Sequence, residues 1–139
     1  MPEVSIITPI YNGEKYINEF LKSILGQTFH DFELIICDDN SSDNSVNVIK
    51  NFSIADDRIR LLKNRKNLGP ARSRNNCIQE SIGRYIAFCD IDDTWSENKV
   101  EIQLIEMQSI KAAISFVNSK VISTNGNTIG YRFYHKKKC

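Results

Sequence analysis

The stretch YIAFCDIDD, residues 85–93, passes from apolar residues directly into three carboxylates, Asp90, Asp92 and Asp93. Its apolar half is typical of a buried strand, which would deliver the acids to its carboxyl end. Like charges this close repel each other, and a bound divalent cation is the simplest way to keep them ionised. The alternative is an acidic turn exposed to water, because aspartate is a common turn residue. We therefore expect a metal site at residues 90–93, which we call the acidic loop.

Strands and helices alternate on both sides of this stretch. Short runs rich in β-branched and apolar residues mark the strands, and apolar residues at helical spacing mark the helices. The predicted strands are residues 4–9, 32–37, 58–62, 84–89 and 112–118, and the predicted helices lie between them. This alternation predicts an α/β fold with a mostly parallel sheet flanked by helices on both faces. Asn125-Gly126, between residues 121–124 and 128–134, predicts a β-hairpin at the end of the chain.

Length and composition predict one ordinary globular domain over residues 1–139. Apolar residues make up 41% of the chain and the net charge is +1, which argues against nucleic acid as a partner. No apolar run approaches the roughly 20 residues that a membrane-spanning helix needs. The four cysteines have no CxxC spacing, so we expect a reduced, cytoplasmic setting. The basic end, residues 134–139, would be a solvated tail, or else a contact with an anionic membrane surface.

Three loops should converge on one edge of the predicted sheet. Parallel strands point the same way, and ligands bind outside their carboxyl ends, near a switch in strand order. The loops after residues 4–9 and 32–37 therefore share one rim with the acidic loop. Together they would present an aromatic ring, a carboxylate pair and the acidic cluster: Tyr11 beside Asn12, Asp38 with Asp39, and Asp90, Asp92 and Asp93. The combination is harder to explain as an exposed turn than any one of its parts.

The residue types on this rim indicate a nucleotide. Tyr11 could stack on a base, and Asp38 or Asp39 could accept hydrogen bonds from a base N–H or a ribose hydroxyl. The acidic loop could hold Mg²⁺ or Mn²⁺ through oxygen ligands, and Arg74 could bind phosphate. The sequence has no glycine-rich phosphate loop, so the phosphates would depend on metal and arginine. The plainer alternatives are that Tyr11 packs over the first helix and that Arg74 pairs with a surface acid.

Four ordered blocks of this sequence resemble family 2 glycosyltransferases with the GT-A fold. The blocks are residues 4–12, residues 33–43, Asn67-Leu68-Gly69 followed by Arg74-Asn75, and residues 83–93, which contain a DxD motif. The resemblance implies transfer of a sugar from a UDP-sugar donor to an acceptor hydroxyl, with inversion at the anomeric carbon, in glycan or polysaccharide biosynthesis. The implied partners are the nucleotide-sugar and a glycan or lipid-linked acceptor, with peripheral membrane association as an option.

By position, the resemblance also implies roles for single residues. Pro9 and Tyr11 would frame the uracil, and Asp39 would accept a hydrogen bond from its imide N–H. Asp92 would coordinate the Mn²⁺ or Mg²⁺ that bridges the diphosphate. Asp90 would lie beside the ribose or the metal.

Arg74 would lie near the phosphates by the same resemblance. Two features of this chain depart from the family pattern. Where the family often has glycine after the Arg-Asn pair, this chain has Asn76-Cys77, which would affect helix packing more than chemistry. The family's catalytic base lies beyond the DxD motif, in the acceptor-binding part, whereas no carboxylate follows Glu106 in this sequence. We therefore expect a donor-binding domain that lacks the acceptor-binding part, and we assign no catalytic residue.

Two other functions stay open on the sequence alone. One is a module of the same fold that binds a UDP-sugar without transferring it, which the missing base favours. The other is a phosphatase, because residues 90–94 also fit the DxDxT motif of haloacid-dehalogenase-type enzymes, whose first aspartate is a nucleophile. Those enzymes need a lysine and further acids downstream, and few acids follow Thr94.

Overall fold

The computed structural model describes residues 1–123 and 125–133, so the predicted basic tail at residues 134–139 lies outside the described residues. The chain forms two compact units, Met1–Glu101 and Ile102–Cys139. Among the described residues, no helix is both long enough and apolar enough to cross a membrane.

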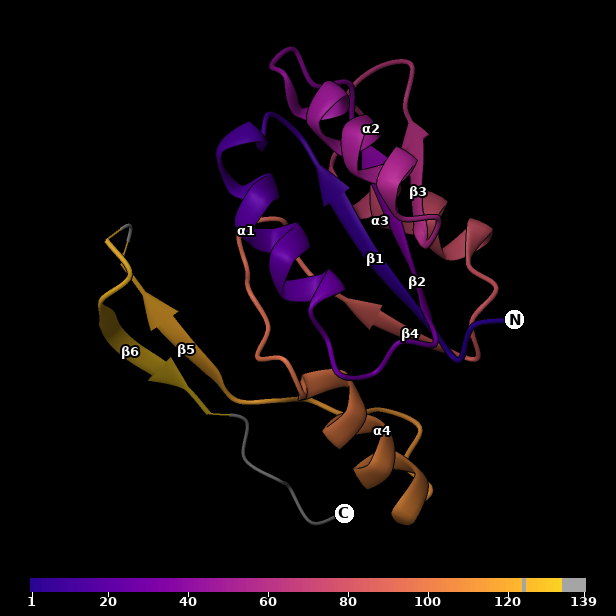
Figure 1. Cartoon of the computed structure of the whole chain (residues 1–139), viewed down its shortest axis with the longest axis vertical. Coiled ribbons are helices and arrows are strands. Elements are labelled where there is room, and N and C mark those ends of the chain that lie inside the picture. Colours follow the sequence, from indigo (N-terminus) through magenta and orange to yellow (C-terminus); the bar gives the residue numbers. More distant parts are fainter. Residues whose placement is uncertain (124, 134–139) are drawn as a thin grey trace. The chain divides into compact units, whose positions relative to one another are not determined.

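A four-stranded parallel sheet forms the centre of the first unit (Figure 1). Its strands are β1 (Val4–Ile10), β2 (Phe32–Asp38), β3 (Ile59–Lys63) and β4 (Tyr85–Phe88). They lie in the order β3-β2-β1-β4, and each neighbouring pair is parallel. Every residue of β1 and β2 is buried, as expected for central strands that are covered on both faces. Because β1 pairs with β2 on one side and β4 on the other, the strand order switches at the carboxyl end of β1.

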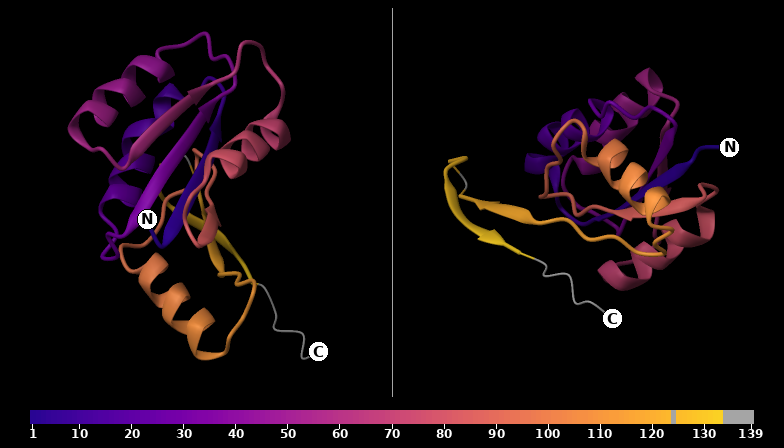
Figure 2. Two further views of the ribbon diagram at one scale, coloured as in Figure 1. Left: turned by 90° about the vertical axis from the view of Figure 1, so that its right-hand side faces the viewer. Right: turned by 90° about the horizontal axis from the view of Figure 1, so that it is seen from below.

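Helices cover both faces of this sheet (Figure 2). The helices of the chain are α1 (Glu14–Leu25), α2 (Ser45–Ala55), α3 (Pro70–Glu80) and α4 (Lys99–Ser109). α1 and α2 lie on one face and α3 lies on the other. The crossovers from β1 to β2 and from β2 to β3 run one way along the sheet, whereas the crossover from β3 to β4 runs back, so right-handed connections place α3 on the opposite face. The predicted α/β fold, a mostly parallel sheet with helices on both faces, is confirmed.

The two faces of the sheet are packed with side chains of different size. α1 buries large apolar residues at helical spacing: Ile17, Phe20, Leu21 and Ile24. α3 buries only the small side chains of Ser73 and Cys77. The Cys77 thiol donates a hydrogen bond to the carbonyl oxygen of Ile35 at 3.6 Å. Small side chains at this contact let α3 lie close to the backbone of β2.

The second unit contains a two-stranded antiparallel sheet made of β5 (Ser119–Ile122) and β6 (Thr128–Arg132). The predicted hairpin is therefore confirmed, with Gly126 at a φ of 79° in its turn, a conformation that glycine adopts without strain. The predicted strand at residues 112–118 is wrong, because that segment is irregular and exposes Ile114 by 72% and Phe116 by 74%. Its alternating pattern supplies strand propensity, but a strand also needs a partner for its backbone hydrogen bonds.

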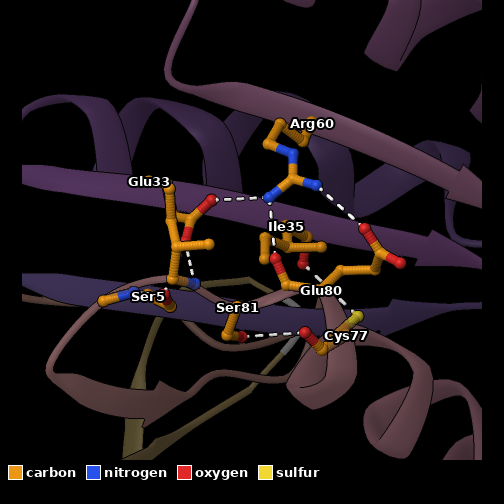
Figure 3. Close-up of polar contacts among 9 residues, drawn as sticks. Ser5, Glu33, Ile35, Arg60, Cys77, Glu80 and Ser81 are labelled. Carbon is orange, nitrogen blue, oxygen red and sulfur yellow. Dashed lines mark hydrogen bonds and ion pairs between the residues drawn. The ribbon is translucent and has the colours of Figure 1, made fainter. Parts of the chain in front are cut away.

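A buried carboxylate, that of Glu33 near the start of β2, ties several elements together (Figure 3). It lies at the amino ends of the strands. Its Oε1 accepts hydrogen bonds from the Ser5 hydroxyl at 2.6 Å and from the backbone N–H of Ile82 at 2.9 Å. Its Oε2 accepts from Arg60 Nη1 at 2.9 Å, and Arg60 also binds Glu80. Burial opposes ionisation of Glu33, yet these hydrogen bonds together hold its pKa below the usual range.

Replacement of Glu33 by alanine is expected to lower the free energy of unfolding by about 3 kcal/mol, because Ser5 and the Ile82 N–H lose their buried acceptor. Urea unfolding followed by circular dichroism measures this change. Glu80→Ala is the matched control, since Glu80 is more than half exposed and its ion pair with Arg60 is worth at most about 1 kcal/mol. Equal losses in the two variants would contradict a structural role for Glu33.

The same carboxylate predicts a pH dependence. Because the folded pKa of Glu33 is depressed, its ionised form stabilises the fold fully above the unfolded pKa, and this contribution is lost as the pH falls through the folded pKa. The stability difference between the wild type and Glu33→Gln is therefore expected to shrink on acidification. A difference that stays constant from neutral pH down to the acid transition would mean that ionisation of Glu33 does not contribute.

Candidate functional site

The loops that follow β1 and β2 are fastened to each other. Asn12 has a φ of 49°, in the left-handed region that asparagine tolerates better than most residues. Its backbone N–H donates to the Ser41 hydroxyl at 2.9 Å, and its side-chain oxygen accepts from the backbone N–H of Ser42 at 2.8 Å. Each loop therefore holds the other beside the carboxyl ends of the two central strands.

The helices that start from these loops satisfy each other's first backbone N–H groups. Gly13 N donates to the Ser45 hydroxyl and Glu14 N donates to the Asp43 carboxylate, both at 3.1 Å, at the start of α1. In return, Asn44 N at the start of α2 donates to the Glu14 carboxylate at 3.1 Å. Neither helix has a side-chain cap from its own N-cap residue, so this exchange replaces the usual arrangement. We call it the reciprocal cap.

Asp39, directly after β2, is a buried carboxylate with three hydrogen-bond donors. Its Oδ1 accepts from Asn64 Nδ2 at 2.7 Å and from the backbone N–H of Leu68 at 2.8 Å. Its Oδ2 accepts from the backbone N–H of Gly69 at 2.7 Å. Burial opposes its ionisation, but these donors and the nearby Ser73 hydroxyl together hold the pKa of Asp39 below its usual range. Asp39 is therefore an ionised, oriented acceptor at the switch in strand order.

Arg74 of α3 forms an ion pair with Asp90 of the acidic loop. The two side chains are 33% and 51% exposed, so the pair lies at the surface and can exchange its partners for a ligand's charges. The backbone N–H of Asp93 donates to the carbonyl oxygen of Asp90 at 3.0 Å, which closes the acidic loop as a turn. Arg74 thus does pair with an exposed acid, and that acid belongs to the same rim.

One pocket, with a volume of about 370 Å³, lies at this rim. It brings together all six residues that the sequence pointed to as binding residues: Pro9, Tyr11, Asp39, Arg74, Asp90 and Asp92. Its other lining residues are Ile10, Asn67, Pro70 and Ile91. Asp38 and Asp93 do not line it, and the Asp38 carboxylate instead accepts from the backbone N–H of Ser41. Asp39 rather than Asp38 lines the pocket after β2, and in the acidic loop Asp90 and Asp92 line it while Asp93 does not.

The acidic loop offers only part of a site for a divalent cation. Asp90 and Asp92 both line the pocket, and carboxylate oxygens suit Mg²⁺ or Mn²⁺. Within residues 1–123 and 125–133, however, no group of three or more His, Cys, Asp or Glu side chains is arranged to hold a metal ion. Two carboxylates would supply only part of the roughly six ligands that such a cation takes, and phosphate and water oxygens would supply the rest.

Sequence reasoning missed the residue that orients Asp39. Asn64, directly after β3, is 8% exposed and donates to both Asp39 and the Ser73 hydroxyl. Nothing in the sequence marks Asn64, because it is one asparagine in a polar, basic loop. The lining residue Asn67 lies in the block Asn67-Leu68-Gly69, so the family resemblance could have pointed to it.

Comparison with known sequences identifies one family. The family described as Glycosyl transferase family 2 matches residues 5–138. The UDP-Glc:alpha-D-GlcNAc-diphosphoundecaprenol beta-1,3-glucosyltransferase WfgD of Escherichia coli is 42% identical over 135 residues, which are 97% of this chain and 52% of the relative. WfaP, a protein of Escherichia coli with the same description, is 40% identical over 118 residues, which are 85% of this chain and 46% of the relative. The chain therefore spans about half the length of these curated relatives.

Two solved structures that resemble this chain were determined with a nucleotide-sugar. S. aureus TarS 1–349 in complex with UDP-GlcNAc matches with a TM-score of 0.73 and 28% identity, over 78% of this chain and 32% of that one. The mannosyltransferase PcManGT from Pyrobaculum calidifontis, in complex with GDP-Man and Mn²⁺, matches with a TM-score of 0.69 and 21% identity, over 76% of this chain and 32% of that one. The second likeness, at its lower identity, concerns the fold alone.

Proposed function

The chain belongs to glycosyl transferase family 2 and has the GT-A fold, and from this we propose that its pocket binds the nucleotide part of a UDP-sugar. The observation that carries the proposal is the meeting of an aromatic ring, a buried ionised carboxylate, an arginine and two exposed acids in one pocket. A pocket of about 370 Å³ is within the range of small-molecule sites, which are roughly 300–1,000 Å³.

The base would lie between β1 and the loop that Asp39 holds. Tyr11 is 53% exposed and lines the pocket, so its ring is accessible for stacking on a flat base. Pro9 forms part of the same wall. Asp39, ionised and fixed by its three donors, would accept the imide N–H of uracil. A charge-assisted hydrogen bond of this kind both orients the base and discriminates against bases that lack the donor.

The diphosphate would lie toward the acidic loop and α3. Asp92 and Asp90 would hold Mg²⁺ or Mn²⁺, which when bound would offset the negative charge that develops on the departing UDP. Arg74 would move from Asp90 to a phosphate oxygen, keeping one charge-assisted hydrogen bond while exchanging its partner. Arg74 would be free to bind phosphate once Asp90 holds a cation, because arginine and cation would compete for the same carboxylate.

The reaction proposed for the whole protein is transfer of the sugar to an acceptor hydroxyl with inversion, in polysaccharide biosynthesis. The names of the two Escherichia coli relatives describe a GlcNAc linked to diphosphoundecaprenol, and we propose an acceptor of that lipid-linked class. Such an acceptor is membrane-bound, so the protein would associate peripherally with the cytoplasmic face of a membrane. The residues of this chain supply donor binding, and none of them is assigned as the base that deprotonates the acceptor.

Calorimetry with UDP and with UDP-glucose, each with and without Mn²⁺, tests donor binding, and release of UDP in the presence of Mn²⁺ tests turnover. Binding that needs Mn²⁺ would support the proposal, whereas absence of binding under all these conditions would refute it. Binding without release of UDP would favour a second candidate, a UDP-sugar-binding module without transferase activity.

Replacement of Tyr11 by alanine is expected to weaken UDP binding by about 1–3 kcal/mol, the scale of a base stacked on an aromatic side chain. Tyr11→Phe keeps the ring and is expected to bind UDP like the wild type, so it separates stacking from a hydroxyl contact. Titration calorimetry at fixed Mn²⁺ concentration measures both variants. Unchanged affinity in Tyr11→Ala would mean that the ring only packs on the protein.

A further inference from the structure

We propose that Asn64 is a positioning residue that restricts Asp39 to a single additional hydrogen bond and so selects a base with one N–H at that contact. The inference rests on the proposed function, since it assumes that the pocket holds a nucleotide base. Asn64 does not itself line the pocket, so it would act only through Asp39.

Most of the hydrogen-bonding positions of the Asp39 carboxylate are already filled by the protein. An ionised carboxylate has about four lone-pair positions, two on each oxygen. Asn64 Nδ2 and the Leu68 N–H both donate to Oδ1, which fills that oxygen. The Gly69 N–H donates to Oδ2. The Ser73 hydroxyl lies near the same carboxylate, so no more than one position, on Oδ2, stays available to a ligand in the pocket.

The neighbours of Asn64 fix the direction in which its side-chain amide points. Its Nδ2 donates to the Ser73 hydroxyl at 2.9 Å as well as to Asp39. Its Oδ1 accepts from Asn76 Nδ2 at 2.9 Å and from the Cys37 thiol at 3.6 Å. With both ends of the amide committed, Asn64 can present only its N–H to Asp39.

The backbone of Asn64 is fixed as well, since its N–H donates to the carbonyl oxygen of Asp38 at 2.9 Å. The side chain thus cannot withdraw from Asp39 without breaking a buried network of hydrogen bonds from β2 and α3. Rotation of the Asp39 carboxylate would free a second acceptor position. The hydrogen bonds that Asn64, Leu68 and Gly69 donate to the carboxylate oppose this rotation.

The consequence for recognition follows from the edges of the bases. Uracil presents one imide N–H between two carbonyl oxygens, which matches a single free acceptor. Guanine presents its ring N–H and its exocyclic amine side by side, and both need acceptors when they are buried. Cytosine presents a ring nitrogen acceptor at the corresponding position, which an ionised carboxylate repels. Asn64 would therefore make the site selective for a uracil-type base over guanine.

The test compares UDP, 3-methyl-UDP and GDP by titration calorimetry with Mn²⁺ on the wild type, Asn64→Ala and Asn64→Leu. The wild type is expected to prefer UDP over both other ligands by about tenfold or more, the effect of one hydrogen bond to a charged group. Asn64→Ala is expected to lower the ratio of UDP to GDP affinity by about tenfold, because Oδ1 regains a free position and the carboxylate can turn. Asn64→Leu keeps the approximate shape, removes the donor without adding a charge beside Asp39, and provides a second variant if alanine prevents folding.

Glu33→Gln is the matched control, because it weakens a buried network at the other end of the sheet and does not touch Asp39. It is expected to lower thermal stability while the ratio of UDP to GDP affinity stays at the wild-type value. A ratio that is unchanged in both Asn64 variants would overturn the role of Asn64 and leave donor binding intact. Failure of the wild type to bind UDP at all would instead refute the proposed function, and the inference with it.

Discussion

Replacement of Asp39 by alanine is expected to weaken UDP binding by at least about a hundredfold and to lower the free energy of unfolding by about 3 kcal/mol. The first effect follows because the base would lose a charge-assisted acceptor inside a pocket. The second follows because Asn64 and the backbone N–H groups of Leu68 and Gly69 lose the carboxylate on which they converge. Calorimetry with UDP and Mn²⁺ measures the binding, and urea unfolding measures the stability.

Two further variants separate these effects of Asp39. Asp39→Asn keeps the shape but turns an N–H toward one of the existing donors, so it is expected to lose UDP affinity as well. Asp38→Asn is the neighbouring control: Asp38 is buried but lies outside the pocket lining, so UDP affinity is expected to stay close to the wild type in any variant that folds. If Asp39→Ala bound UDP as tightly as Asp38→Asn, the base would have to be recognised elsewhere.

Replacement of Asp92 by alanine is expected to abolish the part of UDP binding that depends on Mn²⁺. Asp92 lines the pocket, whereas Asp90 beside it is already paired with Arg74. Loss of residues that merely orient a metal ligand lowers metal affinity by about 10–100-fold, so loss of a ligand itself is expected to cost at least as much. Titration of Mn²⁺ at a fixed UDP concentration, followed by calorimetry, measures the change.

Asp93→Ala is the matched control for Asp92→Ala. It removes an equal charge from the neighbouring residue, whose side chain does not line the pocket. It is expected to keep the Mn²⁺ dependence of UDP binding. Two results would contradict the proposed metal site: unchanged Mn²⁺ dependence in Asp92→Ala, or an equal loss in both variants. The second result would point to the overall negative charge of the acidic loop rather than to coordination by Asp92.

Most of the fold of the first unit could be predicted because its signals are local. β1 and β2 are short apolar runs with every residue buried, and the amphipathic pattern of α1 matches its buried face. The segment at residues 112–118 shows the limit of such signals. Its alternation of Ile114 and Phe116 with smaller side chains is as strand-like as the predicted strands that formed, but pairing is a long-range property that a local pattern cannot specify.

The meeting of six residues at one pocket could also be predicted, since strand ends in a parallel sheet share an edge. Their individual roles toward a nucleotide and a metal remain predictions. Asn64 could not be found this way, because its importance depends on contacts with Asp39 from the end of β2 and Ser73 from α3. A side chain that acts through another residue leaves no mark in the spacing of its own segment.

The reciprocal cap between the loops after β1 and β2 has a consequence for how this protein can vary. Glu14 serves the start of α2, while Asp43 and Ser45 serve the start of α1, so a change in one loop leaves a donor or acceptor of the other unmatched. During divergence, a substitution in one of the two loops would have to be accompanied or soon followed by a compensating substitution in the other. An engineer who wishes to transplant this edge of the pocket into a related scaffold should therefore exchange both loops together.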